Sequence, residues 1–179
     1  MSALEIILCD LEPKMVAAWE RHFARFENVE VIEGDLTEMY ADAYVSPANS
    51  YGYMDGGIDL ALRERFAACD IERRVQEKIA GLGGMLPVGS AIVVETGDDE
   101  VAYLICAPTM EVPSVVAHTN NAHRAMRALL NAVAEFNAKT DGAITSIAIP
   151  GLCTGIGDME PEIAARQMAL AYEEWLERI

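Results

Sequence analysis

Residues 43–68 read AYVSPANSYGYMDGGIDLALRERFAA, and this stretch passes from a strand through a polar loop into a helix. The run from Ala43 to Val45 has the short, β-rich character of a strand. Ile58 to Ala68 follows a glycine pair and has the character of a helix that starts close to Asp59. A strand that leads through a loop into a helix is the repeating unit of α/β proteins.

The rest of the chain repeats this alternation. Further strands are predicted at residues 4–9, 29–32, 91–94, 101–107 and 143–149, and further helices at 15–26, 71–79, 119–136 and 161–179. A polar turn, Gly97-Asp98-Asp99, separates two of the strands, as expected of a hairpin. We therefore predict one α/β domain over residues 1–179, a three-layer α/β/α sandwich around a mixed, mostly parallel sheet.

The charge balance restricts the partners of the chain. It has 29 acidic and 13 basic residues among 179, a formal net charge of −16, which disfavours a nucleic-acid polymer as partner. Backbone N–H groups can still bind the phosphates of a small ligand. The four cysteines show no CxxC spacing, and the amino-terminal stretch has neither a basic region nor a membrane-spanning run. These features favour a cytoplasmic protein without a membrane partner, and they leave the oligomeric state open.

Three polar segments follow strands and are candidates for ligand binding. They are Gly34-Asp35-Leu36-Thr37, the loop from Pro47 to Asp59, and the glycine-rich loop from Pro150 to Gly157. In α/β folds ligands bind beyond the carboxyl ends of the strands. Glycines allow the backbone to approach a ligand closely, and a following helix offers unpaired N–H groups to a phosphate. The second and third segments, if they face each other, could hold a diphosphate.

The order of these motifs resembles the macrodomain family over about residues 30–178. The motifs that carry the likeness are Gly-Asp-Leu-Thr, Ala-Asn-Ser, Gly-Gly-Ile-Asp at a helix start, and a late strand that ends Ile-Pro-x-x-x-Thr-Gly-Ile. The resemblance implies binding of ADP-ribose or a related nucleotide diphosphate without a cofactor or a metal. It also implies residue roles. Asp35, with the backbone of Leu36 beside it, is expected to bind the adenine amino group.

The remaining roles implied by the resemblance belong to the two facing loops. Asn49 is expected to contact the distal ribose, and Asp59 matches the acidic residue of members that hydrolyse ADP-ribosyl esters. In that activity Asp59 would orient or deprotonate a water that attacks the anomeric carbon, while Asn49 fixes the sugar. The other expected ligand-binding residues are Gly56, Gly57 and Ile58 on one side and Cys153, Thr154, Gly155, Ile156 and Gly157 on the other.

The chain departs from the family pattern at several positions. The usual Asn-Ala-Ala-Asn reads Ser46-Pro47-Ala48-Asn49, the glycine run is shortened to Gly56-Gly57, and Gly157 stands where many members have an aromatic residue. Two alternatives to ester hydrolysis therefore stay open: a phosphatase acting on ADP-ribose 1''-phosphate, and a non-catalytic binding or structural module. An open cleft between Asp55 and Thr154, as opposed to one filled by Tyr53, would favour ligand binding.

Each candidate residue also has an ordinary structural interpretation. Asp35 could cap a turn, Asn49 could bond its own backbone, and Asp59 could be a first-turn acid favoured by the helix dipole. Cys153 lacks the arginine six residues later that a cysteine phosphatase needs, because position 159 is Met159. Residues 1–28 carry no motif, and we interpret them as a strand and helix added at an edge of the sheet.

Overall fold

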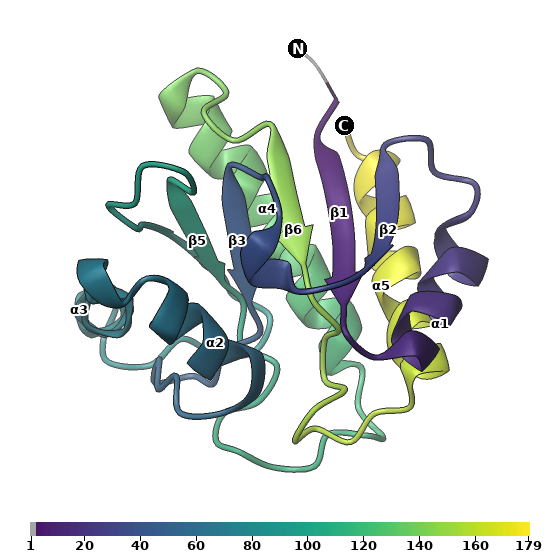
Figure 1. Ribbon diagram of the computed structural model, residues 1–179, viewed down its shortest axis with the longest axis horizontal. Coiled ribbons are helices and arrows are strands. Elements are labelled where there is room, and N and C mark those ends of the chain that lie inside the picture. Colours follow the sequence, from purple (N-terminus) through teal and green to yellow (C-terminus); the bar gives the residue numbers. More distant parts are fainter. Residues whose placement is uncertain (1–2) are drawn as a thin grey trace.

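A computed structural model describes residues 3–179 of the chain. These residues form six strands, five α-helices and two short 3-10 helices (Figure 1). The strands are β1 (Glu5–Asp10), β2 (Val29–Glu33), β3 (Ala43–Ser46), β4 (Ile92–Glu95), β5 (Tyr103–Cys106) and β6 (Ser146–Ile149). The helices are α1 (Pro13–Phe23), η1 (Leu36–Glu38), α2 (Gly57–Arg65), η2 (Ala67–Cys69), α3 (Ile71–Ala80), α4 (Asn121–Thr140) and α5 (Pro161–Leu176).

The strands lie in one sheet with the order β2-β1-β6-β3-β5-β4. The first five strands in this order are mutually parallel. When these five strands are followed along the chain, at least one helical segment lies between each strand and the next, and this connection returns the chain to the same end of the sheet. β4 runs antiparallel to β5, with Ile92 opposite Cys106, and the short turn between them makes a hairpin. The prediction of a mixed, mostly parallel sheet is confirmed.

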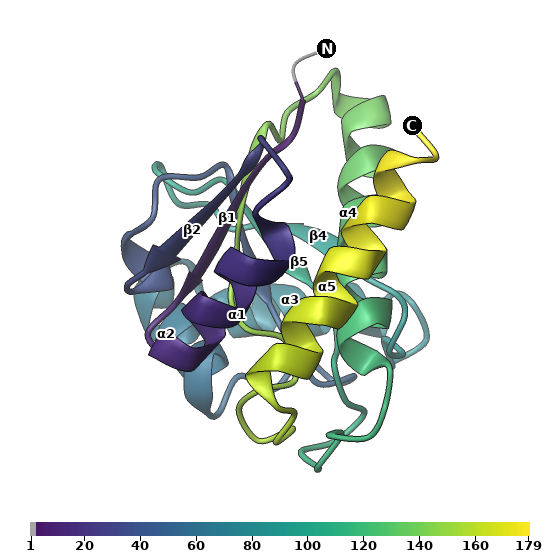
Figure 2. The ribbon, with the colours of Figure 1, turned by 90° about the vertical axis from the view of Figure 1, so that its right-hand side faces the viewer.

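Helices cover both faces of this sheet, as the views in Figure 1 and Figure 2 show. α1, α4 and α5 pack on one face, where Trp19 and Tyr172 are among the largest fully buried side chains. α2 and α3 pack on the other face, around Phe66 and Ile79. The two apolar clusters lie on opposite sides of the strands, so the three-layer α/β/α architecture is confirmed. None of the helices in residues 3–179 combines the length and apolarity needed to cross a membrane.

The amino-terminal strand is an interior strand and not the edge strand that the sequence suggested. β1 pairs with β2 on one side and with β6 on the other, and the edges of the sheet are β2 and β4. Leu8 of β1 and Met15 of α1 are completely buried in the larger apolar cluster. The error arose because pairing between strands that are distant in sequence leaves no local signal.

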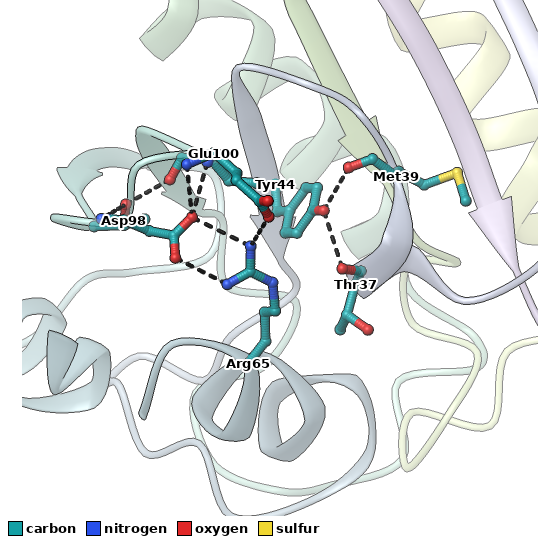
Figure 3. Close-up of polar contacts among 8 residues, drawn as sticks. Thr37, Met39, Tyr44, Arg65, Asp98 and Glu100 are labelled. Carbon is teal, nitrogen blue, oxygen red and sulfur yellow. Dashed lines mark hydrogen bonds and ion pairs between the residues drawn. The ribbon is translucent and has the colours of Figure 1, made fainter. Parts of the chain in front are cut away.

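A polar cluster fixes the carboxyl end of α2 against the β4–β5 hairpin (Figure 3). Arg65 donates two hydrogen bonds to the carboxylate of Asp98, at 2.9 and 3.2 Å, and a third to Glu100. These bonds to Arg65 lower the pKa of Asp98 to about 2. Nearby, the hydroxyl of Tyr44 donates to the carbonyl oxygen of Met39 at 2.5 Å. Because this end of α2 is held at the amino side of the sheet, its first turn is directed toward the carboxyl side.

Candidate functional site

A cleft of about 500 Å³ lies beyond the carboxyl ends of β3, β5 and β6. Three loops form its walls, and they gather below the sheet in the view of Figure 1. The first wall is residues 47–59, the second is residues 109–113, and the third is residues 151–157. The cleft is open between Asp55 and Thr154, because Tyr53 lies at the rim with 57% of its surface exposed and does not fill it.

Asn49 holds the first wall in shape. Its side-chain amide donates to the carbonyl oxygen of Tyr53 at 2.8 Å, and its side-chain oxygen accepts from the N–H groups of Tyr51 at 3.0 Å and Tyr53 at 3.3 Å. This is the Asx-turn arrangement that the sequence also allowed. A carboxamide has two N–H donors. Asn49 therefore braces the loop with one of them, and the second makes no hydrogen bond within residues 3–179.

The helix α2 begins at the cleft. Gly56 is its N-cap and offers no side-chain acceptor, and the first residue, Gly57, has a positive φ of 57°. The first N–H groups of a helix lack acceptors within the helix, so those of Gly57, Ile58 and Asp59 remain available for a ligand. A Cβ atom built on Gly56 or Gly57 meets no atom within 4 Å, which shows that open space lies beside this backbone.

Asp59 places a nearly buried carboxylate at the cleft. The residue is only 8% exposed, and the hydroxyl of Ser46, at the end of β3, donates to its Oδ1 atom at 2.6 Å. Burial raises the pKa of Asp59 to about 6, and the Ser46 hydrogen bond opposes that increase in part. The sequence placed Asp59 close to the start of the helix. The structure adds the contact with Ser46, which no sequence pattern indicated.

The third wall is a tightly folded loop with free N–H groups. Cys153 adopts a left-handed conformation with φ of 68°, and its carbonyl oxygen accepts from the N–H of Met159 at 3.0 Å. Within residues 3–179, no hydrogen bond of the chain engages the N–H groups of residues 154–157. Successive free N–H groups of this kind form an anion-binding nest. Burial raises the pKa of the Cys153 thiol to about 12, so it stays neutral and is unsuited to nucleophilic attack.

The second wall was missed by the sequence analysis. Residues 109–113 follow β5, which lies beside β3 in the sheet. The two chains continue side by side past their strand ends: Thr109 N–H donates to the Ala48 carbonyl at 3.0 Å, and Ser50 N–H to the Glu111 carbonyl at 3.1 Å. The rule that ligands bind beyond strand ends, applied to β5 as well, would have identified this segment.

Asp35 and Leu36 do not line this cleft. The carboxylate of Asp35 caps η1 by accepting from the N–H of Thr37 at 2.9 Å and from its hydroxyl at 2.7 Å, and the Leu36 side chain is buried in the core. Asp35 follows β2, which is two strand positions from β6, or roughly 10 Å at the usual strand spacing. Asp35 therefore lies beyond the carboxyl ends of the strands, as the cleft does, but outside the walls of the cleft.

The electrostatics of the cleft depend on backbone groups. Among residues 3–179 the charged side chains that line it are Asp55, Asp59 and Glu111, and none is lysine or arginine. An anion in the cleft would therefore be held by the N–H groups of the α2 start and of residues 154–157, which line its first and third walls. The structure brings together every expected site residue except Asp35 and Leu36.

Comparisons with known proteins agree with this architecture. The family model described as "Macro domain" matches residues 45–168. A protein of Aquifex aeolicus is 36% identical over 141 residues, which cover 79% of this chain and 78% of that protein. The macrodomain of Mycobacterium tuberculosis DarG superposes with a TM-score of 0.65 at 23% identity, covering 79% of this chain and 88% of that one.

A second solved structure extends the likeness of fold. Thermosipho africanus DarTG, solved in complex with ADP-ribose, has a TM-score of 0.62 at 19% identity and is covered over 38% of its length by 79% of this chain. At such identities the solved structures show a shared fold, whereas the family match spans most of the chain. The chain belongs to the macro domain family.

Proposed function

We propose that the cleft binds the ADP-ribosyl group, with the diphosphate between the two sets of free N–H groups. The observation that carries the proposal is that both sets, at the start of α2 and in residues 154–157, line the same cleft from two different loops. Both are arrangements that bind phosphate without a basic side chain. ADP-ribose is the ligand in the similar Thermosipho africanus structure.

The length of ADP-ribose suits the arrangement along the sheet. A cleft of about 500 Å³ is within the range of small-molecule sites and can take the diphosphate and one ribose. The adenosine end would then extend past β6 and β1 toward Asp35, whose carboxylate would meet the adenine amino group.

The four cysteines are free thiols, which supports our placing the protein in the cytoplasm.

A charge introduced into the third wall tests this proposal. Thr154→Asp places a carboxylate among the free N–H groups, and we expect it to raise the Kd for ADP-ribose at least tenfold in isothermal titration. Tyr40→Asp is the matched control, because Tyr40 is 94% exposed and lies outside the cleft. Equal affinity of the two variants, or absence of binding by the unaltered protein at millimolar ADP-ribose, would refute the proposal.

The buried carboxylate of Asp59 at the cleft supports a second function, the hydrolysis of ADP-ribosyl esters. A general base should have a pKa not far from the working pH, and the pKa of Asp59 is raised to about 6. For an acidic side chain linked to the anomeric carbon, Asp59 would take a proton from a water whose oxygen bonds to that carbon, while the side-chain carboxylate leaves with the electron pair of the broken bond. For O-acetyl-ADP-ribose, which carries the acetyl group on a ribose hydroxyl, the water would attack the acetyl carbonyl carbon, and the ribose oxygen would leave and take up a proton as acetate is released. Asn49 would hold the distal ribose. Candidate substrates are O-acetyl-ADP-ribose and acidic side chains that carry ADP-ribose.

The hydrolysis proposal is tested separately from binding. We expect Asp59→Asn to lose at least a hundredfold in turnover of O-acetyl-ADP-ribose, a size typical of the loss of a general base, while still binding ADP-ribose. If the unaltered protein bound ADP-ribose but did not turn over O-acetyl-ADP-ribose, ester hydrolysis would fail, and the phosphatase and the non-catalytic binding module would remain. Unchanged turnover by Asp59→Asn would exclude Asp59 as the base.

A further inference from the structure

We propose that Asp10 is a positioning residue that holds the phosphate-binding loop, residues 151–157, through the backbone of Gly151. The inference rests on the proposed function for its effect on ligand binding, but its structural content can be tested without a ligand. Asp10 ends β1 and precedes the segment matched by the family model, which starts at residue 45. The proposal therefore gives the amino-terminal strand a part in the site.

The geometry joins Asp10 to the base of the loop. β1 and β6 are parallel neighbours with Leu8 opposite Ile149, so Asp10 lies beside the point where the chain leaves β6. Its Oδ2 atom accepts from the N–H of Gly151 at 3.0 Å, and its Oδ1 atom accepts from the N–H of Glu12 at 2.9 Å. Pro150 has no N–H, so Gly151 carries the first backbone donor of the loop. One carboxylate thus links the start of the loop to the connection between β1 and α1.

The loop is also packed closely at this contact. A Cβ atom on Gly151 would lie 2.5 Å from the Thr154 hydroxyl oxygen and 2.8 Å from Asp10 Oδ2, both too short for real contacts. Thr154 therefore folds back over Gly151 while Asp10 holds Gly151 from β1. Thr154 begins the run of free N–H groups, so Gly151 lies against the residue at which these groups start. Asp10 does not line the cleft and acts only through the loop.

Hydrogen bonding and charge make opposite contributions here. The bond to Gly151 orders the loop, whereas the negative charge of Asp10 would repel a phosphate bound by the N–H groups of residues 154–157. Asp10→Asn removes the charge and one of the two acceptor oxygens. Its remaining oxygen can accept from the part-buried N–H of Gly151, because the exposed N–H of Glu12 can bond to water instead. Asp10→Ala removes the charge and both acceptors. The positioning role therefore predicts that the two substitutions differ. A residue that only stabilised the fold through its charge would give the same loss in both.

The test measures loop order and ligand affinity in the full chain. By hydrogen exchange, we expect the amides of residues 151–157 to exchange at least tenfold faster in Asp10→Ala than in the unaltered protein, and close to normally in Asp10→Asn. The Kd for ADP-ribose should rise at least fivefold in Asp10→Ala and stay within twofold in Asp10→Asn. Asp42→Ala is the matched control, because Asp42 accepts from the N–H groups of Thr145 and Ser146 at the opposite end of β6.

The outcomes separate this proposal from the proposed function. Unchanged exchange of residues 151–157 in Asp10→Ala, or equally fast exchange in Asp10→Ala and Asp10→Asn, would overturn the positioning role. Loop exchange that is equally fast in Asp42→Ala would also overturn it, because the effect would then reflect general destabilisation. If the unaltered protein bound no ADP-ribose, the proposed function would fail, and the exchange rates would still decide the role of Asp10.

Discussion

The hydroxyl of Ser46 donates a 2.6 Å hydrogen bond to Oδ1 of Asp59, which joins the end of β3 to the first turn of α2. Both residues are buried, and the carboxylate lines the cleft. A hydrogen bond to the ionised form lowers the pKa of a carboxyl group, and burial raises it. Ser46 therefore limits the effect of burial and keeps Asp59 able to ionise near neutral pH.

Ser46→Ala should raise the pKa of Asp59 above its value of about 6, because the hydrogen bond that favours the carboxylate is lost while the burial remains. The direct measurement is a pH titration of the Asp59 carboxyl carbon by NMR, in the unaltered protein and in the variant. A pKa that falls, or stays the same, in Ser46→Ala would show that the bond does not stabilise the ionised form.

Asp59→Asn should stabilise the protein at pH 7. The folded-state pKa of about 6 exceeds the usual 3.8, so the folded state binds more protons than the unfolded state between these values. The contribution of Asp59 to stability is therefore fully present below pH 4, falls as the pH rises toward 6, and is constant above it. A shift of this size corresponds to at most about 3 kcal/mol. Urea unfolding should show Asp59→Asn more stable by about 1 to 3 kcal/mol at pH 7.5, with a smaller gain at pH 4.5.

Equal stability of the unaltered protein and Asp59→Asn would contradict this prediction. If the unaltered protein and Asp59→Asn had the same stability at both pH values, the carboxylate would be better solvated than its burial indicates. If Asp59→Asn had a higher free energy of unfolding at pH 7.5 and had lost turnover of O-acetyl-ADP-ribose, the carboxylate of Asp59 would serve the activity while lowering stability.

The ion pair of Arg65 and Asp98 should contribute stability that is lost in acid. Their side chains are 22% and 19% exposed, and the pKa of Asp98 is lowered to about 2. The contribution is present above the unfolded pKa near 4 and disappears as the pH falls toward 2. We expect Asp98→Asn to cost about 1 to 2 kcal/mol at pH 7 and progressively less below pH 4.

The control for Asp98 is an exposed ion pair. Asp70 and Arg73 are 60% and 58% exposed, and Asp70→Asn should change the free energy of unfolding by less than about 0.5 kcal/mol. A cost for Asp98→Asn that does not depend on pH would contradict the ion-pair explanation.

Gly157→Ala should distort the loop of residues 151–157. A Cβ atom there would lie 2.5 Å from the Cys153 carbonyl oxygen and 2.8 Å from the Val116 side chain. We expect a loss of about 1 to 3 kcal/mol in the free energy of unfolding and a weaker affinity for ADP-ribose. Gly155→Ala is the matched control, since its Cβ atom would meet nothing within 4 Å. Equal behaviour of the two variants in thermal unfolding would contradict this account of the loop.

Local sequence features predicted much of the fold. Periodic apolar positions placed the strands and helices, and the glycines near Asp59 and Thr154 identified two of the three cleft walls. The interior position of β1 could not be predicted, because it depends on pairing with β6, which is more than 130 residues away in sequence. The contacts of Ser46 with Asp59 and of Asp10 with Gly151 also cross between elements, so no local pattern reveals them.

The most direct test of the central claim is a titration of ¹⁵N-labelled protein with ADP-ribose, followed through the backbone amides. The account predicts the largest shifts at Gly57 and Ile58 on one wall and at Gly155 and Ile156 on the other, because their free N–H groups would bind the diphosphate. Saturating ADP-ribose that left these four amides unshifted would contradict it.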